Sequence, residues 1–105
     1  MHRSHLSAEE RRWRAKLAQL VSDAGLLRGS LTLRRRVCGR PNCRCTDGQT
    51  HDAWYLTTTK NGKRTQLYVP HQEEEATKQW VENFQRVREL LEKISELHWK
   101  RLKER

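Results

Sequence analysis

The dipeptide Asn61-Gly62, which lies between two β-rich runs, constrains the fold of this chain more than any other feature. The run AWYLTTTK comes before it and the run KRTQLYV comes after it. A type I′ turn requires a positive φ at both central residues, and asparagine and glycine adopt that conformation most readily. The sequence therefore predicts a β-hairpin closed by a two-residue turn.

Alternation along the hairpin assigns its residues to two faces. The apolar side chains that we expect to point inward are Trp54, Leu56, Leu67 and Val69. The side chains that we expect to point outward are polar or aromatic: Tyr55, Thr57, Thr59, Arg64, Gln66 and Tyr68. One face is thus predicted to be buried and the other exposed.

A third strand is predicted after Gly29, where the apolar residues also recur with a period of two. Its inward positions are Leu31, Leu33 and Val37, and its outward positions are Thr32, Arg34 and Arg36. Arg35 interrupts the apolar face. The expected result is a three-stranded antiparallel sheet with a basic and aromatic outer face, which ends at Pro70.

A first helix is predicted over residues 7–24. Ser7 and Glu10 match a capping box, in which the serine side chain accepts a hydrogen bond from the third residue of the helix. Apolar residues then recur at helical spacing. We expect Gly25 to end this helix in a left-handed conformation.

A long second helix is predicted over residues 71–103, because the acidic run from Glu73 to Glu75 suits a helix N-terminus. Its apolar residues follow a four-three spacing: Trp80, Phe84, Val87, Leu91, Ile94 and His98. A stripe of this kind packs either on the first helix or against a second chain as a coiled-coil dimer. In the second case Phe84, Leu91 and Ile94 are the candidate residues for self-association or partner binding.

The predicted fold class is therefore α+β: an N-terminal helix, a three-stranded antiparallel sheet over residues 28–70, and a long C-terminal helix. A chain of 105 residues forms one domain. Hydrophobic residues are 34% of the chain and charged residues 33%, so the core is small. Small cores are often completed by a metal ion or a partner chain.

A cluster of cysteines between the first two predicted strands supplies such a metal site. Cys38, Cys43, Cys45 and His51 follow the pattern C-x4-C-x-C-x5-H. Zinc takes four sulfur or nitrogen ligands tetrahedrally, and a site closed by four protein ligands leaves no water to activate. We therefore predict a structural Zn2+ ion in a zinc knuckle between the first and second strands.

Two alternatives stay open for this cluster. His5 or His71 can replace His51 as the fourth ligand if the fold brings either of them close. The cysteines can instead be three reduced thiols in a loop, without a metal.

The positive charge of the chain lies in its middle. The net charge is +9, and residues 28–64 hold nine basic and two acidic residues, whereas residues 65–105 hold eight of each. Basic side chains that neutralise phosphates release counterions and so favour binding to nucleic acid. We therefore expect a nucleic-acid-binding protein that acts through the sheet. The candidate residues are Arg34, Arg36, Arg40, Arg44, Tyr55, Lys60, Lys63, Arg64 and Tyr68.

Other classes of protein fit the sequence less well. A protein-interaction adaptor that uses the long helix is the main alternative, with zinc purely structural. An enzyme is not expected, because there is no Ser/His/Asp set and no glycine-rich phosphate loop. No apolar run is long enough for a secretory signal or a membrane span, so we expect a cytoplasmic protein that makes no membrane contact.

The cysteine box and its surroundings resemble a small bacterial and phage family that is catalogued as a domain of unknown function. The likeness covers about residues 28–100, although many relatives have Gly-Pro-Tyr after the histidine where this chain has Asp52-Ala53-Trp54. It is carried by GSL at 29–31, CGRPNCRC at 38–45, His51, Tyr55-Leu56, Gly62-Lys63, Tyr68-Val69-Pro70 and Trp80. Relatives lie near transposases, so the resemblance implies an accessory role in a mobile element or phage and favours DNA over RNA.

A weaker resemblance is to the three-stranded arm-binding domains of phage integrases, in which a sheet lies in the DNA major groove. Gly62-Lys63-Arg64 occupies the position of their Gly-Lys-Arg hairpin. This likeness is one of fold alone, and it implies only a geometry for docking on duplex DNA.

Overall fold

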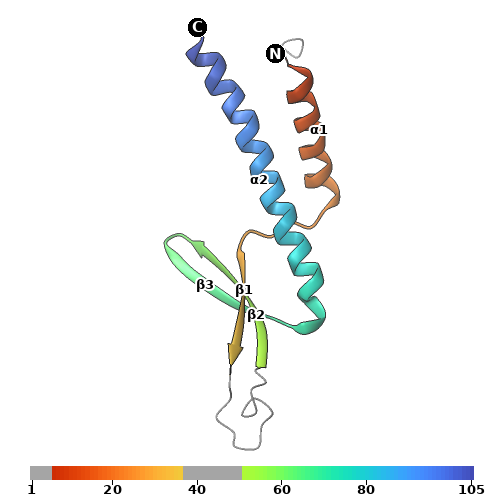
Figure 1. Ribbon diagram of the computed structural model, residues 1–105, viewed down its shortest axis with the longest axis vertical. Coiled ribbons are helices and arrows are strands. Elements are labelled where there is room, and N and C mark those ends of the chain that lie inside the picture. The colour runs from red at the N-terminus through yellow and green to blue at the C-terminus, as the bar shows by residue number, and fades with distance from the viewer. Residues whose placement is uncertain (1–5, 37–50) are drawn as a thin grey trace, which may run out of the picture. The chain divides into compact units, whose positions relative to one another are not determined.

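The computed structural model describes residues 6–36 and 51–105. In chain order its elements are α1 (Ala8–Asp23), β1 (Ser30–Arg36), β2 (His51–Lys60), β3 (Lys63–Val69), a 3-10 turn (His71–Glu73) and α2 (Glu74–Lys103) (Figure 1). The predicted α+β order of helix, three strands and long helix is confirmed. Neither α1 nor α2 combines the length and apolarity that a membrane span requires.

The three strands form one antiparallel sheet in the order β1-β2-β3. Strand β1 pairs with β2 from Ser30 opposite Thr57 to Arg36 opposite His51. Strand β3 pairs with β2 from Trp54 opposite Val69 to Lys60 opposite Lys63. The short loop between β2 and β3 makes this pairing local, and β2 lies in the centre of the sheet.

Backbone geometry at two positions holds the register. Asn61 and Gly62 have φ values of 53° and 78°, so both occupy the left-handed region that a type I′ turn requires, and the hairpin prediction is confirmed. A Cβ atom on Gly29 would lie 2.7 Å from Leu56 Cδ1 and 3.1 Å from the Thr57 carbonyl oxygen. The chain therefore enters β1 in close contact with β2.

One face of the sheet, called the inner face, carries the residues predicted to point inward. Register places Leu31 opposite Leu56 and Leu56 opposite Leu67 on this side. Val69 is buried, and Lys78 Nζ of α2 lies 4.7 Å from the centre of the Trp54 ring. The start of α2 thus covers the Trp54 end of the inner face, while Leu67 is 64% exposed and was wrongly predicted to be buried.

The described residues divide into two compact units. Residues 28–81 contain the sheet and the first turns of α2, and we call them the sheet unit. Residues 6–27 and 82–105 contain α1 and the rest of α2, and we call them the helical unit. The single-domain organisation stays a prediction.

Helix α1 begins as the sequence predicts but ends differently. Ser7 Oγ accepts a hydrogen bond from the Glu10 N–H at 3.1 Å, as a capping box requires. At the other end Ala24 is extended, and Gly25 is not in the left-handed region. The helix ends within one residue of the predicted bound, but the predicted left-handed conformation of Gly25 is wrong, because the chain leaves the helix directly in extended form. The Gly25 carbonyl instead accepts a hydrogen bond from Asn83 Nδ2 at 3.0 Å.

Helix α1 and the later part of α2 pack side by side and antiparallel (Figure 1). Near the start of α1, Glu10 contacts Arg101, and one turn later the Trp13 ring lies 5.8 Å from Lys93 Nζ. Leu90 and Ile94 are buried. Leu90 and Ile94 therefore pack within the helical unit, whereas Leu91 of the predicted stripe is exposed, and the coiled-coil dimer stays a prediction.

Glu10 is the most buried side chain of the helical unit, with none of its surface exposed. Its Oε2 accepts a hydrogen bond from Arg14 Nε at 2.7 Å and lies 3.4 Å from His98 Nε2. Its Oε1 lies 3.0 Å from Arg101 Nη1, an ion pair that lacks the angles of a hydrogen bond. Burial raises the pKa of Glu10, but these partners outweigh burial and lower the pKa below its ordinary value.

Candidate nucleic-acid interface

The second face of the sheet, called the outer face, is made of polar, basic and aromatic residues. Strand alternation and register bring together Ser30, Thr32, Arg34, Ala53, Tyr55, Thr57, Thr59, Arg64, Gln66 and Tyr68. The start of α2 contacts the opposite side, through Trp54. Tyr68 is 52% exposed. The outer face is therefore open to a ligand, as the sequence predicts.

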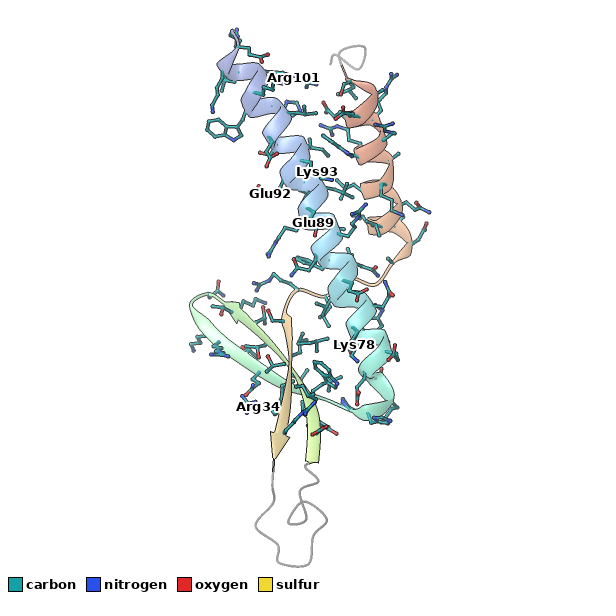
Figure 2. The ribbon with its side chains drawn as sticks, viewed as in Figure 1. Arg34, Lys78, Glu89, Glu92, Lys93 and Arg101 are labelled. Atoms are coloured by element: carbon teal, nitrogen blue, oxygen red, sulfur yellow. The ribbon has the colours of Figure 1, made fainter. Side chains whose placement is uncertain are left out.

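A row of three side chains crosses the outer face, one from each strand. Arg34 of β1 places its guanidinium carbon 4.8 Å from the centre of the Tyr55 ring of β2. The Tyr55 ring meets the Tyr68 ring of β3 edge to face, with centres 5.8 Å apart and planes at 65°. Figure 2 shows Arg34 on β1 and, on α2, the Lys78 side chain that contacts Trp54. A cation and two aromatic rings thus form one continuous contact chain.

The charged residues of the three strands are mostly positive. The strands carry a single carboxylate, Asp52, against six basic residues: Arg34, Arg35, Arg36, Lys60, Lys63 and Arg64. Asp52 lies opposite Arg35, one position away from the outer-face residue Ala53, and so belongs to the inner face. Within residues 30–36 and 51–69 the outer face therefore has no carboxylate, and an approaching polyanion meets attraction there.

The hairpin end of the sheet gathers further cations, but not all on one face. Arg64 lies opposite Thr59 on the outer face, whereas Lys60 and Lys63 lie opposite each other at inner-face positions. All three are exposed. Of the predicted set, Arg34, Tyr55, Arg64 and Tyr68 share the outer face, and the two lysines stand on the other side of the hairpin tip.

Arg28 is a basic residue at this end that the sequence analysis did not single out. Its Nη2 donates a hydrogen bond to the Thr59 carbonyl oxygen at 2.8 Å. Because Thr59 is the register partner of Arg64, Arg28 and Arg64 both lie next to Thr59 of β2. The signal in the sequence was an arginine just before Gly29, where β1 begins to pair with the far end of β2.

The predicted zinc ligands fall mostly outside the described residues. Cys38, Cys43 and Cys45 lie there, as do the candidate phosphate contacts Arg40 and Arg44. Arg36 and His51 are described by their backbone alone, as the last register pair of β1 and β2. Among residues 6–36 and 51–105, no group of three metal-binding side chains is found. The zinc site stays a prediction.

The three residues predicted for partner binding differ in exposure. Ile94 is buried, Leu91 is exposed, and Phe84 is half-buried with the Arg88 guanidinium 5.6 Å from its ring centre. Trp99 and Leu102, which the sequence analysis did not single out, are also exposed. An apolar surface on α2 is thus present, and Ile94 lies in the packed side of the helix.

The fold and its open face define a small basic α+β protein with an aromatic and cationic sheet surface. The chain belongs to the family described as Domain of unknown function (DUF6788), whose sequence pattern matches residues 6–79. The match includes α1 and all three strands, so it extends further toward the N-terminus than the resemblance seen in the sequence. No curated protein and no solved structure matches the chain.

Proposed function

We propose that the protein binds nucleic acid through the outer face of its sheet, with DNA favoured over RNA. The observation that carries the proposal is the row of Arg34, Tyr55 and Tyr68 on a face where residues 30–36 and 51–69 place no carboxylate. Guanidinium groups contact phosphates or base edges, tyrosine rings stack on bases, and tyrosine hydroxyl groups donate hydrogen bonds to phosphates. In the helical unit, by contrast, Arg14 and Arg101 are engaged with Glu10.

A structural zinc ion is part of this proposal. The donor set of Cys38, Cys43, Cys45 and His51 fits tetrahedral zinc in chemistry and number. Support for its place comes from the backbone: Arg36 and His51 are register partners, so the segment that holds the cysteines starts and ends on neighbouring strands. Zinc bound there would hold β1 against β2. Metal analysis of the purified protein, with Cys43→Ser as the variant, tests the proposed zinc site.

The test of nucleic-acid binding compares two neighbouring arginines. Arg34 belongs to the outer face and Arg35 to the inner face. Labelled DNA and RNA are titrated with the full chain over about 50 to 300 mM salt. We expect affinity to fall steeply with salt, and Arg34→Gln to weaken binding several times more than Arg35→Gln. Equal effects of the two variants, or no binding at the low end of salt, would contradict the proposal.

A second candidate function is that of an interaction adaptor. Leu91, Trp99 and Leu102 are exposed on α2, and contiguous exposed apolar surface of this kind is where a partner would bind. Native mass spectrometry without nucleic acid distinguishes the two functions. An adaptor that pairs through α2 gives a dimer that Leu91→Gln dissolves, whereas a protein that acts through the sheet alone gives a monomer.

A further inference from the structure

The row of Arg34, Tyr55 and Tyr68 on the outer face bears on which form of nucleic acid the protein binds. We infer that this face binds single strands in preference to duplexes, an inference that rests on the proposed nucleic-acid function. Width alone does not decide the question, since three strands span about 10 Å and a major groove is about 12 Å wide. The side chains in the middle of the face decide it.

Tyr68 is the central group in this argument. It lies on the edge strand β3, and half of its surface is exposed. It meets Tyr55 edge to face rather than in a stack, so the two rings do not cover each other's faces in parallel. In a duplex the faces of the bases are covered by their neighbours, and only their edges are presented in the grooves. A ring with a free face therefore has a stacking partner only when the bases are unpaired.

Arg34 extends the same surface toward β1. Its guanidinium is planar and lies over Tyr55, which fixes the orientation of both groups. A guanidinium held on one side by an aromatic ring can stack on a base or contact a phosphate with its other side. Together Arg34 and Tyr68 offer two contact points for successive nucleotides, one on each side of Tyr55.

The positions of the cations suit a strand that passes along the face. Arg34 lies level with Ala53 near one end of β2, and Arg64 lies level with Thr59 near the hairpin, where Arg28 also reaches. The separation of Ala53 and Thr59 along β2 corresponds to about 20 Å. Between these ends lie the tyrosines and the small polar side chains of Thr57 and Gln66. Phosphates can therefore be held at both ends while bases occupy the middle.

The experiment measures the affinity of the full-length protein for three labelled probes of one sequence: single-stranded DNA, single-stranded RNA and duplex DNA. The variants are Tyr68→Thr, which keeps a strand-forming residue, and Tyr68→Phe, which keeps the ring. Leu67→Thr is the matched control, because Leu67 is the next residue on β3, is also exposed, and belongs to the inner face. Thermal melts confirm that each variant is folded.

We expect a single strand to bind more tightly than the duplex. Tyr68→Thr should weaken that binding by roughly 5- to 100-fold, the range of one base–aromatic stack. Tyr68→Phe and Leu67→Thr should stay within about twofold of the parent, since neither removes a stacking ring from the outer face. The comparison of the DNA and RNA arms then shows which strand is preferred.

Three results would overturn the inference. Duplex that binds as tightly as either single strand, with no effect of Tyr68→Thr, contradicts it while the proposed nucleic-acid function stands. An equal loss in Tyr68→Phe and Tyr68→Thr shows that the hydroxyl group matters and not the stacking. No binding of any probe removes the proposed function itself, and the inference with it.

Discussion

Two arginines of the helical unit and two of the sheet unit are used in opposite ways. In the helical unit, Arg14 and Arg101 turn toward Glu10, a carboxylate with no exposed surface. In the sheet unit, Arg34 lies on an aromatic ring and Arg64 is exposed. The first arrangement joins two helices, and the second leaves positive charge available to a ligand.

The difference shows that net charge alone does not locate a binding surface. The total of +9 includes cations that are already paired inside the protein. What matters is whether a carboxylate lies on the same face, because a nearby opposite charge removes most of the attraction that a phosphate would meet.

The double variant Arg34→Gln/Arg64→Gln should weaken nucleic-acid binding on the order of 10- to 100-fold, and each lost phosphate contact should lower the salt slope by about 1. Fluorescence anisotropy across a salt series measures both quantities. The matched variant in the other unit is Arg14→Gln, which should leave affinity unchanged because Arg14 is engaged with Glu10. A similar loss in both variants would show that binding depends on total charge and not on the outer face.

Glu10→Gln should lower the free energy of unfolding by about 1–2 kcal/mol, since it replaces charged hydrogen bonds of a buried carboxylate with neutral ones. That loss corresponds to a fall in Tm of several degrees, at about 4–8 °C per kcal/mol for a domain of this size. Glu9→Gln is the control, because Glu9 is the neighbouring residue and is exposed. Equal melting temperatures of the two variants would contradict the role given to Glu10.

The lowered pKa of Glu10 predicts a direction for the effect of acid. Burial alone raises the pKa of Glu10, but the contacts of Glu10 with Arg14, Arg101 and His98 lower it overall, so the folded state holds the proton less tightly than the unfolded state. The stability from this group is then full above its unfolded pKa of 4.5 and is lost as pH falls through the lower folded pKa. Denaturant titrations between about pH 6 and pH 3 should therefore show a steeper loss in the parent than in Glu10→Gln. Parallel curves of stability against pH for the parent and Glu10→Gln would contradict the predicted effect of Glu10.

Gly62→Ala should destabilise the sheet unit by about 1 kcal/mol, because its φ of 78° is costly for a residue with a side chain. A Cβ atom there meets nothing within 4 Å, so the effect comes from the backbone alone. Asn61→Gly is the control and should be nearly neutral. Thermal melts give the size of the effect, and an unchanged melt for Gly62→Ala would show that the turn does not hold the register.

Much of the fold could be predicted because it depends on local signals. Asn61-Gly62 determines the hairpin, and the alternation of Leu56 and Tyr55 then assigns its faces. The burial of Glu10 could not be predicted, since its partner Arg101 is far away in the sequence. The sequence identified Glu10 only as a residue of the capping box, and its backbone N–H does donate a hydrogen bond to Ser7 Oγ.

The candidate site shows the same division between local and distant information. Arg34, Tyr55 and Tyr68 were predicted to share a face because strand alternation is a local rule. Grouping Lys63 with Arg64 overlooked the same rule, which places adjacent strand residues on opposite faces. Arg28 was not found because its contact with Thr59 depends on how β1 approaches β2.

The most direct test of the central claim compares Arg64→Gln with Lys63→Gln in the full chain. The two residues are neighbours on β3, are both exposed and carry the same charge, but Arg64 lies on the outer face and Lys63 on the inner face. The measurement is the affinity for labelled nucleic acid across a salt series. If the outer face is the binding surface, Arg64→Gln lowers both affinity and salt slope, and Lys63→Gln changes them little. If the two variants lose affinity equally, or Lys63→Gln loses more, the outer face is not the binding surface.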